Sequence, residues 1–216
     1  MYKGIIFDMD GLMFDTEAAY LKANLMASDD LNIHMVAEDY YQLVGASEEE
    51  ATGFIETHFT SPEQEQTFYR LTEQHVLELL EAGEIARKPG LTELLAFIEQ
   101  HGLQRVIASS NNKRMIAAFL DYFKLNQYFD EIISREDVTA SKPAPDLFLK
   151  AVATLNLAKS ETLILEDSPN GVAAAKAAQV PVVMIPDLLQ PKAAERQVAT
   201  AILPDLKQVI DFLQVV

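Results

Sequence analysis

Apolar residues along this chain form short continuous runs separated by stretches in which they recur every three or four positions. Short apolar runs bounded by turn residues predict buried strands, and the three-four spacing predicts helices. The expected strands are residues 4–7, 105–108, 131–133, 162–165 and 180–185. The expected helices are residues 91–98, 115–123, 147–155, 169–179 and 206–215. Strands that alternate with helices predict an α/β fold with a parallel sheet covered on both faces.

The segment from about residue 18 to 82 breaks this alternation, because it shows no strand pattern. Ser61 and Pro62 suit the N-cap and first position of a long helix, and Gly83 suits its end. We therefore expect an all-helical cap inserted after the first strand. The predicted domains are a core of residues 1–16 and 84–216 and a cap of residues 17–83.

Two carboxylates follow the first predicted strand directly. Asp8 and Asp10 come where the apolar run ends and the chain turns at Gly11. Side chains two positions apart on an extended chain point the same way, so two negative charges crowd into one small volume. Because open α/β sheets hold their ligands at strand ends, this pattern predicts a cation at this position.

Other polar groups follow the later strands in the same way. Ser109, Lys142 and the pair Glu166-Asp167 lie at or just after apolar runs or in a nearby loop. The ends of parallel strands share one edge of a sheet, so these groups should converge there. Four acids, an ammonium and a hydroxyl suit phosphoryl transfer, in which a lysine and a divalent cation offset phosphate charge. Ligands that are all oxygen favour Mg²⁺.

Composition removes several other functions. A formal net charge of -16 argues against nucleic acids and anionic membranes as partners. The absence of cysteine excludes disulfides and thiolate sites. Asp8 interrupts the first apolar run before a signal peptide could form, so we expect a cytoplasmic protein. The four histidines show no metal-ligand spacing, and we expect surface or packing roles for them.

These residues resemble the four motifs of the haloacid dehalogenase superfamily of hydrolases, in the subgroup similar to β-phosphoglucomutase and sugar-phosphate phosphatases. The motifs stand in order as Asp8-Met9-Asp10-Gly11 with Asp15-Thr16, Ala108-Ser109-Ser110-Asn111, Ser141-Lys142-Pro143, and Glu166-Asp167-Ser168 with Gly171. The resemblance covers the whole chain, including the cap. It implies a Rossmann-like core with an inserted helical-bundle cap.

The resemblance also implies the roles of individual residues. Asp8 would be the nucleophile that forms an aspartyl-phosphate, and Asp10 the general acid and base. Mg²⁺ would be held by the Asp8 carboxylate, the Asp10 backbone carbonyl and Asp167, with Glu166 as a further ligand or a close neighbour. The remaining implied residues are Ser109, Ser110, Asn111 and Lys142 around the phosphoryl group, Thr16 to orient Asp10, and Ser168 and Asn170 to support the metal loop or to cap the following helix.

One departure from the subgroup concerns specificity. The mutases that this chain resembles grip a second phosphate with Lys and Arg in a cap loop, and residues 43–48 here read Leu-Val-Gly-Ala-Ser-Glu. Tyr20 stands where the mutases have a histidine that steers proton transfer. A bisphosphate intermediate would therefore not be retained, which favours water as the acceptor. We expect a phosphatase for a small phosphorylated metabolite such as a sugar or polyol phosphate.

Two alternatives stay open at this point. A hexose-phosphate mutase would share every core motif, and a non-enzymatic sensor or scaffold could retain the fold. The presence of Asp10 argues against the dehalogenase branch, which resembles this chain but lacks that acid. We expect a monomer or a weak homo-oligomer.

Overall fold

The computed structural model describes residues 1–43 and 48–215. It separates into two compact units, one formed by Met1–Asp15 with Ala86–Val216 and the other by Thr16–Ile85. Among the described residues, no helix is both long and apolar enough to cross a bilayer.

The larger unit, called the core unit below, is built on a parallel sheet. Its described residues form six strands in the order β3-β2-β1-β4-β5-β6, which confirms the predicted α/β fold. The strands are β1 Gly4–Phe7, β2 Gln104–Ala108, β3 Ile132–Ile133, β4 Thr162–Glu166, β5 Val182–Met184 and β6 Ala201–Ile202. The strand β6 was not predicted, because two half-buried residues make no readable pattern.

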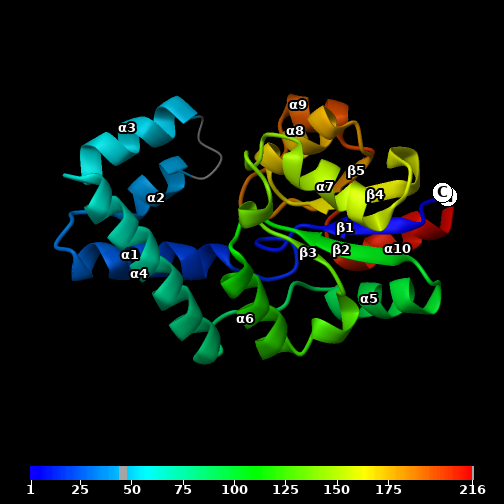
Figure 1. The fold of residues 1–216 in the computed structure, drawn as a ribbon, viewed down its shortest axis with the longest axis horizontal. Helices are drawn as coiled ribbons and strands as arrows, with labels where there is room; N and C mark the ends of the chain where they lie inside the picture. The colour runs from blue at the N-terminus through cyan, green and yellow to red at the C-terminus, as the bar shows by residue number, and fades with distance from the viewer. Residues whose placement is uncertain (44–47, 216) are drawn as a thin grey trace. The chain divides into compact units, whose positions relative to one another are not determined.

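Helices cover both faces of this sheet. Figure 1 shows α7 and α8 over one face and α5 and α6 over the other. The helices of the core unit are α5 Leu91–Gln100, α6 Lys113–Phe123, α7 Asp146–Leu155, α8 Pro169–Ala178, α9 Ala193–Val198 and α10 Leu206–Val215. Three short 3₁₀-helices join them, η1 Asn126–Tyr128, η2 Arg135–Asp137 and η3 Lys159–Glu161. Of these helices, α9 was not predicted, because six residues are too few to show helical periodicity.

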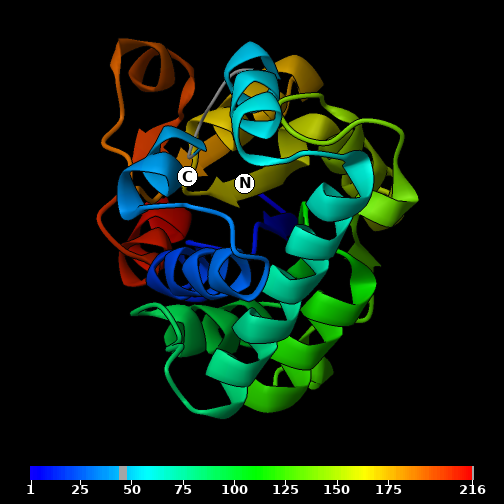
Figure 2. The same ribbon diagram turned by 90° about the vertical axis from the view of Figure 1, so that its left-hand side faces the viewer.

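The smaller unit, called the cap unit below, is entirely helical in its described part. Its helices are α1 Glu17–Asp30, α2 Ala37–Leu43, α3 Glu48–His58 and α4 Pro62–Glu81. The long helices α1 and α4 pack against each other (Figure 2). As predicted, Ser61 caps α4 by accepting a hydrogen bond from the Gln64 backbone N–H. The apolar core of the cap unit contains Ala27, Met35, Phe54, Phe59 and Phe68.

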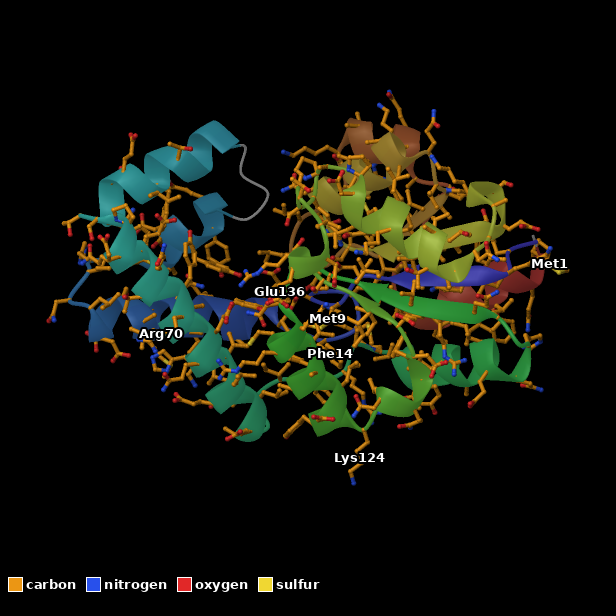
Figure 3. The ribbon with its side chains drawn as sticks, in the orientation of Figure 1. Met1, Met9, Phe14, Arg70, Lys124 and Glu136 are labelled. Carbon is orange, nitrogen blue, oxygen red and sulfur yellow. The ribbon has the colours of Figure 1, made fainter. Side chains whose placement is uncertain are left out.

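Apolar burial on both faces fixes the sheet of the core unit. Ile6, Val106 and Ile164 are buried in one cluster with residues of α7 and α8. On the other side, Phe14 stacks on Phe123 of α6, with ring centroids 4.8 Å apart. Figure 3 shows Phe14 and Met9 inside this unit, and both are fully buried. Each such side chain contributes roughly 1.5–3 kcal/mol on burial, so the chain segment that carries the two predicted acids is held rigidly.

Candidate active site

Three strand ends come level at one edge of the sheet. Phe7 at the end of β1 is in register with Ile107 of β2 and Leu165 of β4. The Asp8 backbone N–H continues this ladder by donating to the Leu165 carbonyl at 3.1 Å. The register therefore brings the polar residues after each strand to the same place. The buried polar side chains at this edge are those of Asp8, Ser109, Glu166 and Asp167.

Lys142 joins two of these carboxylates. Its ammonium donates to Asp8 Oδ1 and, at 2.6 Å, to Glu166 Oε1. Its side chain is only 6% exposed, and the Nζ atom lies 4.8 Å from the centre of the Phe148 ring. With both carboxylates ionised, the single ammonium leaves one net negative charge among side chains that are almost fully buried.

Burial controls the protonation of this group. It raises the pKa of Asp8 to about 7, with Glu166 adding to the rise and Lys142 opposing it. Burial alone would lower the pKa of Lys142, but the charges of Asp8 and Glu166 outweigh it and raise that pKa. Lys142 therefore stays charged, and Asp8 lies where a second cation would favour its ionised form.

Both oxygens of Glu166 are engaged by protein groups. Oε1 accepts from Lys142, while Oε2 accepts from the Ser168 backbone N–H at 2.7 Å and from its hydroxyl at 3.0 Å. A Cβ added at Gly171 would collide with this carboxylate. Ser168 also caps α8 by accepting from the Gly171 N–H, so it supports the loop and the helix together. Asn170 lies half-buried in the first turn of α8.

Asn111 contacts Asp10, which the sequence did not lead us to expect. The Asn111 side-chain amide donates to Asp10 Oδ2 at 2.6 Å, and its backbone N–H donates to the Ser109 hydroxyl at 3.1 Å. Ser110 between them is exposed. The loop after β2 thus holds Asp10 through Asn111, a role that needs the side-chain direction and could not be read from the motif alone.

Gly11 and Asp187 complete the surroundings of Asp167. Gly11 adopts φ +73°, and a Cβ there would collide with Asp167 Oδ2 and lie 3.2 Å from Asp187 Oδ2. Asp187 forms an ion pair with Lys88 at 2.5 Å. Asp187 was not among the predicted site residues, although it follows the predicted strand 180–185 just as the other acids follow their strands.

The donor set fits a hard divalent cation. Carboxylate oxygens of Asp8, Glu166 and Asp167 lie within 4.8 Å of one another, and all three residues are buried. Oxygen-only donors of this charge are those that Mg²⁺ prefers. Because Glu166 already binds Lys142 and Ser168, Asp8 and Asp167 are the carboxylates best placed to be direct ligands.

The remaining predicted residues belong to the cap unit. Thr16 is buried at the N-terminus of α1, and Tyr20 lies half-buried in its first turns. Of the predicted specificity loop, residues 44–47 lie outside the described part of the chain. The expectation that this loop lacks a grip for a second phosphate therefore stays a prediction.

Comparison with known proteins identifies the family. The family model described as haloacid dehalogenase-like hydrolase matches residues 5–185. A probable pseudouridine-5'-phosphatase of Drosophila melanogaster is 31% identical over 210 residues, covering 94% of this chain and 90% of that protein. A phosphorylated carbohydrates phosphatase of Thermotoga maritima is 25% identical over 178 residues, covering 82% of each chain.

A solved structure supports the fold independently. The crystal structure of CbbY from Rhodobacter sphaeroides in complex with phosphate superposes with a TM-score of 0.83 at 23% identity, covering 97% of this chain and 96% of that one. The family match spans well over half of the sequence and confirms the resemblance drawn from the four motifs. The chain belongs to the haloacid dehalogenase-like hydrolases.

Proposed function

We propose that this protein is a Mg²⁺-dependent phosphatase that hydrolyses a small phosphorylated metabolite, most simply a sugar or polyol phosphate. The family match and the phosphatase names of its relatives confirm the predicted enzyme class, a phosphoric monoester hydrolase. The observation that carries the finer proposal is the buried Asp8 carboxylate, held by Lys142 beside Asp167 at the edge of the sheet.

In the first step, a carboxylate oxygen of Asp8 attacks the phosphorus of the monoester. The bond from phosphorus to the substrate oxygen breaks, and an aspartyl-phosphate forms. Asp10 protonates the departing oxygen. Because the Asn111 amide donates to Asp10 Oδ2, the transferable proton belongs on Oδ1.

In the second step, water attacks the phosphorus of the aspartyl-phosphate. Asp10, now ionised, takes a proton from that water, and the bond between phosphorus and the Asp8 oxygen breaks to release phosphate. The same carboxyl therefore acts as acid and then as base. The products are the free alcohol and inorganic phosphate, and both acids return to their starting protonation.

The residues around Asp8 offset the negative charge of the phosphoryl group. Mg²⁺ would be held by the Asp8 and Asp167 carboxylates and the Asp10 backbone carbonyl, and when bound it offsets charge on the phosphoryl oxygens. Lys142 offers its ammonium to the same oxygens, and Glu166 holds Lys142 in place. The Ser109 hydroxyl lies at the same edge as a further donor.

The choice of water over a second sugar phosphate rests on the cap sequence. Residues 43–48 contain neither Lys nor Arg. A mutase must retain its bisphosphate intermediate while that intermediate reorients in the site. A cap loop without cations offers no positive charge to hold the second phosphate. Hydrolysis is therefore the favoured outcome.

The proposal is tested by releasing phosphate from a panel of phosphorylated sugars and polyols, with and without Mg²⁺. For the preferred substrate, Asp8→Asn should reduce turnover by roughly 10⁴-fold or more, the scale expected for loss of a covalent nucleophile. Asp211→Asn, an exposed carboxylate on α10, serves as the matched control and should change nothing. Wild-type phosphate release by Asp8→Asn would overturn the nucleophile. Bisphosphate-primed isomerisation with little phosphate release would instead establish a mutase.

A further inference from the structure

The ion pair between Lys88 and Asp187 lies beside the proposed metal ligands but has no part in the steps above. Lys88 is anchored through its backbone, whose N–H donates to the Met13 carbonyl at 2.9 Å. The neighbouring Asp15 N–H donates to the Ala86 carbonyl, also at 2.9 Å, so residues 13–15 and 86–88 are paired. Lys88 is thus fixed next to the turn that carries Asp8 and Asp10.

Asp187 approaches the same turn from another strand of the sheet. It follows β5, which is in register with β4 where Glu166 faces Met184. The Ile185 N–H donates to the Glu166 carbonyl at 2.7 Å and ties the two strand ends together. One carboxylate oxygen of Asp187 comes within 4.8 Å of one of Asp167. The loop after β5 therefore presents an acid to the metal edge of the site.

The two oxygens of Asp187 have different surroundings. Oδ1 binds Lys88 at 2.5 Å, whereas Oδ2 is buried, close to Gly11, and has no hydrogen-bond partner among the described residues. The side chains of Lys88 and Asp187 are 18% and 15% exposed. Leaving a buried acceptor without a donor costs about 1–3 kcal/mol of folding free energy. A ligand that donates a hydrogen bond to Oδ2 would offset this cost.

We propose that Asp187 is a positioning residue for Mg²⁺, an inference that rests on the proposed function. Mg²⁺ keeps several of its waters when bound to proteins, and their O–H groups need acceptors in the surrounding shell. The Oδ2 atom beside Asp167 supplies such an acceptor together with negative charge. Lys88 holds the carboxylate in this direction through Oδ1 and reduces its charge.

The alternative is that the pair is a structural strut between two loops. The two explanations predict different changes in Mg²⁺ affinity when either partner is substituted. If Asp187 acts on the cation, removing its charge weakens Mg²⁺ binding, while removing the charge of Lys88 leaves Asp187 uncompensated and tightens binding. If the pair is a strut, removing either partner loosens the same loops, and Mg²⁺ binding weakens in both variants or in neither.

The test is calorimetric titration of the metal-free protein with Mg²⁺ for the wild type, Asp187→Asn and Lys88→Met. The dissociation constant should rise about tenfold in Asp187→Asn, as is typical for residues that support metal ligands, and should fall in Lys88→Met. Glu161→Gln is the matched control, because Glu161 also pairs with a lysine, Lys3 at 2.5 Å, but lies just before β4, at the opposite end of that strand from Glu166. It should leave the constant unchanged. Circular dichroism melting confirms that each variant is folded.

The outcomes separate this inference from the proposed function. Weaker binding in both variants, or unchanged binding in Asp187→Asn, overturns the role of Asp187 but leaves an Mg²⁺-dependent phosphatase standing if the wild type releases phosphate with Mg²⁺. A wild type that neither binds Mg²⁺ nor needs it for turnover removes both. Opposite shifts in the two variants support the proposal.

Discussion

Two clusters in this protein each place one basic side chain between two carboxylates, one in the core unit and one in the cap unit. The lysine cluster consists of Lys142, Asp8 and Glu166, and the histidine cluster consists of His75, Asp30 and Glu78. In the histidine cluster the ring nitrogens lie 2.8 Å from each carboxylate. The contact distances are alike, but the basic groups differ, an ammonium in one cluster and an imidazole in the other, and so do their surroundings.

Exposure to water separates them. Side chains of the lysine cluster are 1–10% exposed, whereas both carboxylates of the histidine cluster are 49% exposed. Water can solvate the second pair of carboxylates but not the first, so ionising the first is costly without further cations. Strongly shifted groups of this kind gather at sites of chemistry, while a solvated cluster can simply join α1 to α4. Similar pairings of one basic side chain with two carboxylates thus serve different purposes according to burial.

The largest effect should come from breaking the lysine cluster. Lys142→Met leaves Asp8 and Glu166 buried without their cation, which should cost on the order of 3–5 kcal/mol in the free energy of unfolding. Phosphate release should fall by about 10²–10³-fold, because the donor that we propose for the phosphoryl oxygens is lost. Urea denaturation and steady-state kinetics measure the two effects.

Lys150→Met provides the control for this change. Lys150 is also a lysine with a hydrogen bond, to the Asp137 carbonyl at 2.9 Å, but its side chain is exposed. Its removal should alter the free energy of unfolding by less than about 0.5 kcal/mol and leave turnover unchanged. Equal effects of the two substitutions would show that burial is not what distinguishes the lysine cluster.

A smaller effect should come from filling the space beside the buried acids. Gly11→Ala would place a methyl group against Asp167 Oδ2. We expect Mg²⁺ affinity, measured by calorimetry, to fall about tenfold or more, because Asp167 must move from its position. The left-handed backbone of Gly11 adds roughly 1–2 kcal/mol of strain once a Cβ is present.

Gly102→Ala separates the strain from the collision. Gly102 also has a positive φ, +64°, but a Cβ there would meet nothing within 4 Å. Gly102→Ala carries the backbone strain alone, so it should lose less stability to urea than Gly11→Ala and should bind Mg²⁺ like the wild type. If both variants bind Mg²⁺ equally well, Asp167 can move without loss of binding. Tight packing around the buried acids would then not be needed for Mg²⁺ affinity.

Most of the fold, and the edge of the sheet at which the candidate site lies, could be predicted from the sequence. Long apolar runs such as Leu163–Leu165 are buried on both faces, so they are readable without knowledge of their neighbours. The placement of acids after these runs then follows from the parallel arrangement. The strand β6 was missed, because its two residues are only half-buried, whereas the equally short β3 includes the buried Ile133.

The contacts within the site could not be predicted in the same way. The bond from Asn111 to Asp10 and the proximity of Asp187 to Asp167 join segments far apart in the chain. They depend on rotamers and loop paths, which residue spacing does not encode. The sequence therefore predicted that the acids at the ends of β1 and β4 gather at one edge of the sheet but not which side chains contact them.

The smallest effect should come from the histidine cluster. Burial alone would lower the pKa of His75, but its bonds to Glu78 and Asp30 and their charges outweigh burial and raise it. A pKa raised by folding stabilises the protein fully below the ordinary value of about 6.5, and this stabilisation is lost as the pH rises through the folded-state pKa. His75→Gln should therefore be most destabilising in acid.

Urea denaturation from roughly pH 5.5 to pH 9 tests this expectation. The difference in unfolding free energy between the wild type and His75→Gln should be about 1 kcal/mol at the acidic end, because solvent screens the half-exposed carboxylates, and should shrink as the pH rises. His101→Gln is the control, since His101 is exposed and its ring bonds the Phe97 carbonyl at 2.8 Å instead of a carboxylate. A difference that stays constant with pH would mean that His75 contributes packing alone, and that charge has no part in joining α1 to α4.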